Sequence, residues 1–540
     1  MFYGGMVQPK NYLVCARGIC PLSVLTAPHR LDCPAGCVLT HSRLLLRHVR
    51  PFLPLNAQHT VMQCFTICCL ISCIWMIFGA RTTTPAPRLA EGEPCARCVC
   101  EVTLPVARAL CVRATSFVFL TCPTRAPPAG YSLAFRPGTK VIGGASRFWL
   151  LGMEAWSVHP LAPTIPESVY MMFQMTFAII TPALIVGGLA ERMRFSSLIV
   201  FMSAWHLIVY CPIAHSVWAT DGFLHMAGIL DYAGGSVVHL NSGVAALMCA
   251  ICLGKRHGHG ISRFEPHNVS ISLIGASLLW VGWFGFNAGS AGGANIAAGT
   301  AMMTTQIATG AGGMSWMFIE WYMKGKPTVM SVISGAVAGL VAITPAAGFV
   351  DANGAIIIGF LVGIFCHFTI HIKDKLGFDD ALDAFGVHGC GGAFGSLMTG
   401  LFAQPKLNQL YPGCPHPNEP CPGPGLAAGQ LVSGAFYDHT LPKAYGLSNR
   451  RGRQIGLQLY GIVVCAGWSA FASYILLKII DRLMGLRVDV QDEVEGLDSS
   501  VHGESVFYGF DEVFGNNKKL EDSVEKGENG NNTADATVKV

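Results

Sequence analysis

Long stretches that are poor in charged residues alternate with short charged stretches along most of this chain. A helix that crosses a bilayer needs about 20 apolar residues, and ten stretches have roughly that length. They lie at 61–79, 167–190, 196–219, 233–254, 269–289, 296–319, 329–348, 353–372, 386–403 and 454–480. The run 269–319 contains no Asp, Glu, Lys or Arg, and its Gly- and Asn-rich segment 287–295 predicts a turn between two spans. The pattern predicts an all-α polytopic membrane protein with ten spans.

The composition agrees with a bilayer as the solvent. Of the 540 residues, 51% are hydrophobic and only 13% are charged, whereas a soluble domain has about 25% charged residues. The formal net charge is +4, so the composition gives no support for a nucleic-acid partner. The expected surroundings are lipid.

The basic residues predict the orientation of the chain. Lys and Arg gather in cytoplasmic loops of membrane proteins, and here short basic segments alternate with loops that contain no charge of that sign. The basic segments at 192–194, 255–263, 324–326, 373–375 and 478–487 all fall on one side of the predicted spans. Segment 404–453 is an exception, with five basic residues on the other side. The C-terminus is therefore expected in the cytoplasm.

Two histidines lie in apolar spans within similar local sequences. "DYAGGSVVHLNSG" (231–243) contains His239 and "DAFGVHGC" (383–390) contains His388; an Asp and glycine precede each histidine. Asp231 and Asp383 are taken as repeat mates. Ionisable groups inside a membrane are costly and mark functional sites, although a lone buried histidine is more often a packing residue. Repetition in two halves favours a paired site near the midplane.

Three further histidines, His206, His215 and His367, also lie in predicted spans. They have no repeated context, so packing or interface roles are expected for them.

Several segments together resemble the ammonium transporter family (Amt/Mep/Rh), in its Amt/Mep branch. They are "TFAIITPALIVGGLAERMRF" (176–195), "PIAHSVW" (212–218), "DYAGGSVVHLNSG" (231–243), "WVGWFGFNAGSAGGAN" (280–295), "SGAVAGLVAITPAAG" (334–348) and "DAFGVHGCGG" (383–392). The resemblance runs from about 131 to 510. It implies a bundle of eleven helices built as an inverted repeat, with the N-terminus outside, and a homotrimer in which each protomer has its own pore.

The N-terminal region departs from the family pattern. "FYGGMVQPKN" (2–11) resembles the end of the first helix, the helix before it is missing, and 61–79 resembles the second helix, whose continuation "YSLAF" stands at 131–135. The expected division is an irregular segment 1–60, the helix 61–79, a spurious or disordered insertion 80–130, the transporter core 131–484 and a cytoplasmic tail 485–540, disordered from about 515. Our hypothesis is that 14–60 and 80–130 are translated non-coding sequence or reflect a faulty gene model, and the alternative is that they are genuine but disordered insertions. "CARCVC" (95–100) has no partner at zinc-finger spacing, so no metal site is expected.

The resemblance also implies roles for individual residues. Trp218 and Ser290 match the outer site that recruits the cation, and Phe177 and Phe286 match a gate of two stacked rings. Taken alone, Trp218 would be read as an interfacial belt residue, and the other three as packing residues. Asp231 is expected to cap its helix or to stabilise the cation site, and Asp383 to be structural.

The chemistry of ammonium explains why these residue types suit it. Ammonium and potassium have similar size and equal charge, so selection must use the N–H donors and the acidic proton of ammonium. A Trp ring attracts a desolvated cation by up to about 2 kcal/mol. Two adjacent imidazoles, His239 and His388, can share one proton, so ammonium can lose its proton there while ammonia continues. Potassium has no proton to give. Return of the proton along the pair would make transport electrogenic.

The expected function is ammonium transport across a membrane, here the plasma membrane, with ammonium or ammonia as the ligand. Three alternatives stay open: an ammonium sensor that signals through the C-terminal tail, a non-functional product of a faulty gene model, and an Rh-like channel for neutral gas. The Trp218 and Ser290 pair argues against the last. The spans contain no phosphate loop, nucleophile motif or metal-ligand set, so no enzyme activity and no cofactor are expected. The tail from 485 resembles the family's tail, which docks on neighbouring protomers.

Overall fold

The computed structural model describes residues 57–77, 130–404 except 262, 263 and 265, then 407 and 452–503. The predictions for 1–56, for 80–129 and for the tail end beyond 515 fall outside these residues. All ten predicted spans are helical in the described part of the chain. Seven are long and apolar enough to cross a membrane by length and composition.

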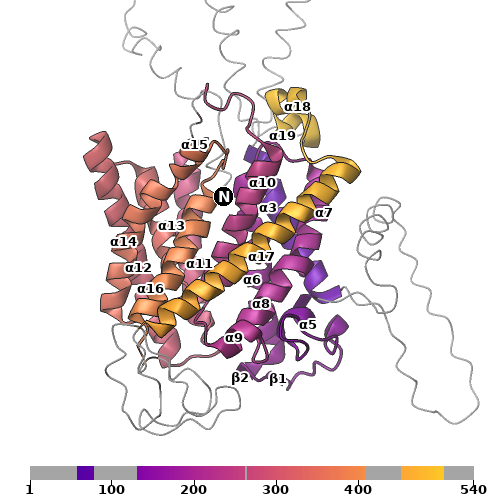
Figure 1. Ribbon diagram of the computed structural model, residues 1–540, viewed down its shortest axis with the longest axis vertical. Coiled ribbons are helices and arrows are strands. Elements are labelled where there is room, and N and C mark those ends of the chain that lie inside the picture. Colours follow the sequence, from indigo (N-terminus) through magenta and orange to yellow (C-terminus); the bar gives the residue numbers. More distant parts are fainter. Residues whose placement is uncertain are drawn as a thin grey trace, which may run out of the picture.

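The spans form two groups that a final helix crosses (Figure 1). The first group comprises α3 (Ala57–Ile77), α6 (Glu167–Leu189), the consecutive α7 (Phe195–Trp205), η5 (His206–Tyr210) and α8 (Cys211–Trp218), and η6 (Gly235–Leu240) with α10 (Asn241–Leu253). The second comprises α11 (Val269–Gly289), α12 (Ile296–Lys324), α13 (Val329–Ile343), α14 (Ala352–Thr369), and η7 (Phe385–Gly389) with α16 (Cys390–Phe402). The long α17 (Arg453–Met484) runs diagonally across both groups.

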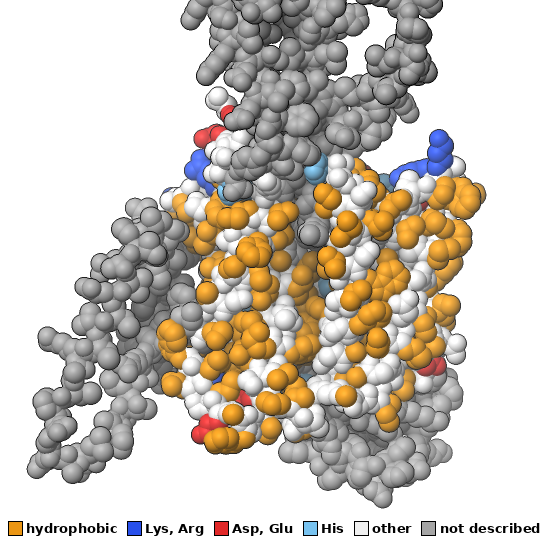
Figure 2. All heavy atoms as spheres, turned by 180° about the vertical axis from the view of Figure 1, so that it is seen from behind, with side chains coloured by type: hydrophobic (Ala, Val, Ile, Leu, Met, Phe, Trp, Pro, Cys, Tyr) orange, Lys and Arg blue, Asp and Glu red, His pale blue; other side chains and the backbone are white. Residues whose placement is uncertain are grey.

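Short elements cover the two ends of the bundle. One end carries α15 (Ile372–Leu376), α18 (Val490–Glu495) and α19 (Leu497–His502). We call it the basic end, because Arg192, Arg256, Lys373 and Arg487 lie there. Figure 2 shows Lys and Arg side chains gathered mainly at this end. The opposite, far end carries α5 (Gly130–Phe135), η4 (Phe148–Leu150), α9 (Phe223–Ala227) and the antiparallel pair β1 (Val158–His159) and β2 (Ala162–Pro166), in which Val158 is opposite Pro166.

Glycines allow the two groups to approach closely at the centre. Gly243 on α10 lies against the backbone of Gly389 in η7, and no Cβ would fit between them. Small residues at such crossings let helix backbones come together in lipid. Because His388 directly precedes Gly389, this crossing brings its ring to the first group of helices.

One helix of the second group has an uncovered face. On α11, Leu278 and Val281 are 60% and 67% exposed, and Gly282 and Gly285 have open space where a Cβ would stand. In the described residues the first group has four spans and the second has five. With the histidine-bearing spans taken as mates, α11 has no counterpart among the described spans of the first group.

The α3 helix and α5 pack together although 52 residues separate them. Trp75 meets the rings of Tyr131 and Phe135, with centroids 6.0 and 6.3 Å apart, and a Cβ on Gly130 would strike the Trp75 ring. The structure places the start of α3 at Ala57 and includes Gly130 in α5, whereas the sequence placed the start of this helix at about 61 and the end of the insertion at 130.

Removal of 80–129 tests whether α3 and α5 form one packing unit. We expect the shortened chain to fold and to unfold at the same temperature as the full chain or higher, because a shorter connection costs less loop-closure entropy. Thermal unfolding in detergent measures this. A matched deletion of 80–135, which also removes α5, should unfold at a lower temperature. Aggregation of the 80–129 deletion, or a loss of more than about 5 °C, would contradict the packing argument.

Candidate functional site

The two predicted histidines lie side by side in the centre of the bundle. The Nδ1 atoms of His239 and His388 are 3.3 Å apart, and their rings are nearly parallel, with centroids 5.3 Å apart and planes 19° from each other. Both side chains are buried. His239 comes from η6 and His388 from η7, so each group of helices supplies one ring.

Both histidines stand in short segments of π-helix. These segments, η6 and η7, precede the α-helices α10 and α16. A π-turn inserts one residue into a helical turn and is frequent at functional sites. Each histidine thus stands just before the start of the α-helix that follows.

Asp231 caps the first of these segments. Its carboxylate accepts hydrogen bonds from the backbone N–H groups of Gly234, Gly235, Ser236 and Val237, at 2.6–3.1 Å. The first N–H groups of a helix have no partner within the helix, so the buried carboxylate satisfies four donors at once. This geometry supports the capping role predicted for Asp231.

At the start of η7 the carboxylate that accepts a backbone N–H group is that of Asp380, whereas the sequence pointed to Asp383 as the repeat mate of Asp231. The Oδ2 atom of Asp380 accepts from the N–H of Phe385, the first residue of η7, at 2.7 Å. Asp383 instead pairs with Nζ of Lys373 at 2.6 Å, and its φ of +56° lies in the left-handed region. The sequence contained the signal, because Asp231 and Asp380 each precede their histidine by eight residues, whereas Asp383 precedes His388 by five.

Aromatic rings form a continuous column from the far end to the histidines. The edge-to-face contact of Trp218 with Phe177 has a centroid distance of 5.5 Å, and Phe177 meets Phe286 at 4.4 Å. Phe286 lies 6.0 Å from His239. The two phenylalanines are tilted by 45° rather than stacked in parallel, and Phe177 is fully buried.

Trp218 and Ser290 occupy the far-end mouth of this column. The indole Nε1 of Trp218 donates to the carbonyl oxygen of Asp231 at 2.9 Å, which fixes the ring. The hydroxyl of Ser290 donates to the carbonyl oxygen of Phe286 at 2.9 Å. Because its proton is used there, the lone pairs of the Ser290 oxygen remain to accept N–H groups from a ligand.

Two aromatic residues of the column were missed from the sequence. Trp283 stacks on His239, with centroids 5.3 Å apart and planes 11° from each other, and its Nε1 donates to Thr344. Phe173 meets Phe177 edge to face at 4.9 Å. The signal was their spacing, since Trp283 lies three residues before Phe286 and Phe173 four before Phe177, which places each pair on one helix face.

Three other buried histidines, for which packing or interface roles were predicted, lie outside this column. His206 stacks on Tyr210, and His367 meets Trp316 edge to face. The two ring nitrogens of His215 lie near backbone carbonyl oxygens. No group of three or more His, Cys, Asp or Glu residues in the described part of the chain is placed to hold a metal ion.

Comparison with known proteins decides the family. The sequence profile of the Ammonium Transporter Family matches residues 128–507. The chain belongs to this family. An ammonium transporter of Bacillus subtilis is 41% identical over 380 residues, which cover 70% of this chain and 85% of that protein. Ammonium transporter 1 of Dictyostelium discoideum is 40% identical over 385 residues, covering 70% and 76%.

Solved structures of the family share the fold. The crystal structure of Saccharomyces cerevisiae Mep2 superposes with a TM-score of 0.58 at 34% identity, covering 74% of this chain and 83% of that one. A structure described as a sensor Amt protein superposes with a TM-score of 0.58 at 23% identity, covering 82% and 98%. The latter likeness concerns the fold alone.

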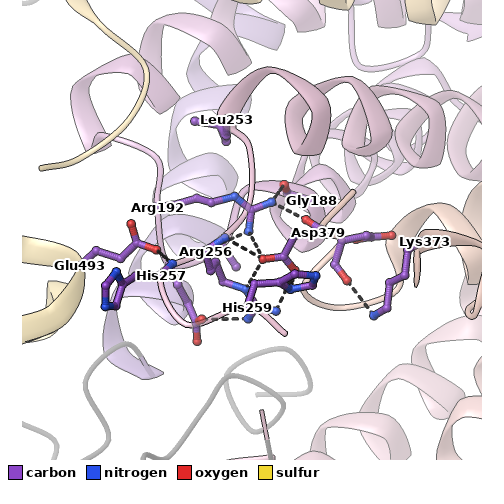
Figure 3. Close-up of polar contacts among 12 residues, drawn as sticks. Gly188, Arg192, Leu253, Arg256, His257, His259, Lys373, Asp379 and Glu493 are labelled. Atoms are coloured by element: carbon purple, nitrogen blue, oxygen red, sulfur yellow. Dashed lines mark hydrogen bonds and ion pairs between the residues drawn. The ribbon is translucent and has the colours of Figure 1, made fainter. Parts of the chain in front are cut away.

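A cluster of buried charges ties the parts of the transporter together at the basic end (Figure 3). Arg256, just after α10, pairs with Asp379 at 2.8 Å and with Glu191 at 2.9 Å. Arg192 pairs with the same Asp379 at 3.6 Å and donates to the carbonyl oxygen of Gly188. Burial opposes ionisation of Asp379, but Arg256 and Arg192 outweigh it and hold the pKa of this carboxyl below its usual range. The cluster thus joins loops of both helix groups.

The C-terminal tail docks beside this cluster on its own chain. Glu493 accepts from the backbone N–H of His257 at 2.6 Å and pairs with Arg487 at 2.8 Å. Farther along, Asp498 accepts from the backbone N–H groups of Gln58 and His59, at the start of α3. The tail therefore contacts both α3 and the loop after α10.

Replacing Asp380 should show that its ionised carboxylate lowers the free energy of unfolding above about pH 6. Burial, followed by the charge of Asp383, raises the pKa of Asp380 to about 6, against about 3.9 in an unfolded chain. Between these values the folded chain holds a proton that the unfolded chain has lost, so the free energy of unfolding falls as the pH rises from about 4 to about 6. The penalty above that window is at most about 3 kcal/mol.

Asp380→Asn keeps an acceptor oxygen for Phe385 and cannot ionise. We expect this variant to unfold like the unsubstituted chain near pH 4 and to be more stable at pH 7, in thermal unfolding followed across that range. Asp374→Asn, at a side chain that is 61% exposed, is the matched control and should show no such divergence. Equal stability of Asp380→Asn and the unsubstituted chain at pH 7 would contradict the account.

Proposed function

We propose that this chain carries ammonium across the plasma membrane by recruiting the cation, removing its proton at the histidine pair and conducting ammonia onward. Membership of the Ammonium Transporter Family supports the transport activity. The single observation that carries the finer mechanism is the aromatic column, which leads from the partly exposed Trp218 to the buried His239 and His388.

Recruitment is proposed at Trp218 and Ser290. The indole offers a ring face to a cation, and the Ser290 oxygen offers lone pairs to its N–H groups. Ammonium gains both interactions. Potassium gains the attraction to the ring but has no proton to donate in a hydrogen bond.

The gate is proposed at Phe177 and Phe286. Their rings meet at 4.4 Å and offer no polar atom to replace water around a cation. A hydrated ion would lose its shell here without compensation. Passage therefore requires side-chain motion and favours the species that leaves water at the lowest cost.

Deprotonation is proposed at the histidine pair. Nε2 of His239 has no hydrogen-bond partner in the described part of the chain, so its lone pair can take a proton from ammonium. The Nδ1 proton of His239 then shifts across the 3.3 Å contact to Nδ1 of His388, and neutral ammonia is released. Potassium cannot take part in this step because it has no proton.

The proton is proposed to continue from His388 toward the basic end, so that each ammonium moves one net charge. In the orientation we propose, the basic end and the C-terminal tail face the cytoplasm. The positions of Arg192, Arg256, Lys373 and Arg487 support this, since Lys and Arg favour the cytoplasmic side.

A homotrimer is proposed as the assembly. The exposed apolar side chains of α11 and its two open glycines give a face that a second helix can approach closely. Size and mass of the detergent-solubilised protein would test the trimer.

Transport is preferred over sensing as the main function. The likeness to a sensor Amt protein is one of fold only, and no contact in the described residues favours a signalling role over transport. Growth rescue of cells that lack ammonium uptake distinguishes an active transporter from a non-functional product.

Current recorded from the full chain in a membrane tests the mechanism. We expect ammonium to evoke current and potassium to evoke none. In His388→Ala the shared proton has no second imidazole, so the current should vanish or lose its preference for ammonium. His371→Ala, at a half-exposed histidine of the basic end, is the matched control and should behave like the unsubstituted chain. Selective ammonium current of unchanged size in His388→Ala would refute the proposed deprotonation step.

A further inference from the structure

We propose that His215 is held as an imidazolium and is a positioning residue for the Trp218 ring. The inference rests on the proposed function, because it deepens the recruitment site. It assigns a role to the buried side chain of His215, which lies near the far end and takes no part in the proposed transport steps.

The ring nitrogens of His215 both face oxygen atoms that can only accept. Nδ1 lies 3.1 Å from the carbonyl oxygen of Ala134, and Nε2 lies 2.8 Å from that of Thr139. A neutral imidazole has one N–H and one lone pair, so it can serve only one of these carbonyls; the imidazolium donates to both. The side chain is fully buried, so water does not replace the missing donor.

A second buried histidine of the far end provides the contrast. His159 accepts the backbone N–H of Leu161 at Nδ1 and has Nε2 3.1 Å from the carbonyl oxygen of Phe135. One acceptor and one donor are what a neutral imidazole offers. Burial is the main cause that lowers the pKa of His159 to about 4. His159 as a neutral ring and His215 as an imidazolium therefore bind the carbonyl groups of two neighbouring residues.

The charge of His215 has a counter-ion. Oδ1 of Asp221 lies 3.5 Å from Nε2, and this carboxylate is 36% exposed, which gives protons a path from the far-end solvent. Oδ2 of Asp221 accepts from the N–H of Gly138. On α9, His225 interacts electrostatically with the same carboxylate.

Two basic residues belong to the loop after α5. Arg136 pairs with Glu167 and donates to Ser146. The backbone carbonyl oxygen of Lys140 accepts the N–H of Phe223 and so ties this loop to α9. The charged group that pairs with the His215 ring is the carboxylate of Asp221.

The link to the recruitment site runs through Phe135. His215 binds the carbonyl of Ala134, and the next residue, Phe135, stacks on Trp218 with planes 14° apart and centroids 6.4 Å apart. Trp218 lies one turn after His215 on α8. The imidazolium thereby ties α5 and its loop to α8 and sets the tilt of the indole against Phe135. A neutral His215 would keep only one of the two hydrogen bonds, and the packing of Phe135 against Trp218 would be less firmly held.

The test compares ammonium-evoked current in the full chain and in His215→Gln between about pH 5.5 and pH 8 on the far-end side, the range in which an imidazole titrates. At acid pH we expect the half-saturating ammonium concentration of His215→Gln to be several-fold higher than that of the unsubstituted chain, with the maximal current within about twofold. The ratio should fall toward one as the pH rises, because the unsubstituted chain also loses the charge.

The control and two further variants separate positioning from general damage. His159→Gln should change half-saturation by a factor that is independent of pH. His215→Lys keeps a cation that can donate to both carbonyls. Its half-saturating ammonium concentration should stay low across the pH range. Asp221→Asn removes the counter-ion of the imidazolium. The half-saturating ammonium concentration should therefore begin to rise at a lower pH than in the unsubstituted chain.

The outcomes distinguish this inference from the proposed function. A constant ratio for His215→Gln, or an Asp221→Asn profile that coincides with that of the unsubstituted chain, overturns the role of His215 while ammonium transport stands. Absence of ammonium current in the unsubstituted chain contradicts the proposed function instead. If His215→Gln does not fold, ring ¹⁵N chemical shifts of the unsubstituted protein near pH 6 decide, because a neutral His215 overturns the proposal.

Discussion

The contact between Nδ1 of His239 and Nδ1 of His388 is the interaction on which the account depends. Two lone pairs at 3.3 Å repel each other, and so do two protons, so the contact is favourable only when one proton lies between the rings. In the mechanism we propose, the pair therefore binds a proton as one unit rather than as two separate histidines. It also requires the two groups of helices to meet closely at the centre of the bundle, which the Gly243 and Gly389 crossing allows.

Neighbouring parts of the fold fix the positions of the two histidines. Asp231 and Asp380 fix the starts of η6 and η7, the segments that carry the two rings. On one side, Trp283 and Phe286 pack against the ring of His239. At the basic end, Asp379 binds arginines from the first group of helices, so the loop that leads into η7 cannot shift independently of them. Rigid packing of this kind suits a narrow dry path better than a wide aqueous pore.

Much of this could be predicted from the sequence, because a bilayer imposes simple rules on it. Charge-poor runs of about 20 residues predicted ten spans, which are all helical in the described part of the chain, and the repeated histidine context drew attention to His239 and His388. Asp383 was matched to Asp231 because similar residues follow both, whereas the eight-residue spacing to the histidine points to Asp380. Trp283 was missed because an aromatic residue in an apolar span is normally only packing. The cluster at Asp379 could not be foreseen, since its partner Arg192 is 187 residues away and no local pattern joins them.

The most direct test measures the proton between the two rings. In the full chain with ¹⁵N-labelled histidine, NMR should resolve one protonated Nδ1 and one bare Nδ1 for the pair at neutral pH, with a through-hydrogen-bond coupling between them. Assignment follows from loss of the signals in His239→Ala and His388→Ala. Two protonated Nδ1 atoms, or two bare ones without coupling, would contradict the shared proton and with it the proposed step that separates ammonium from potassium.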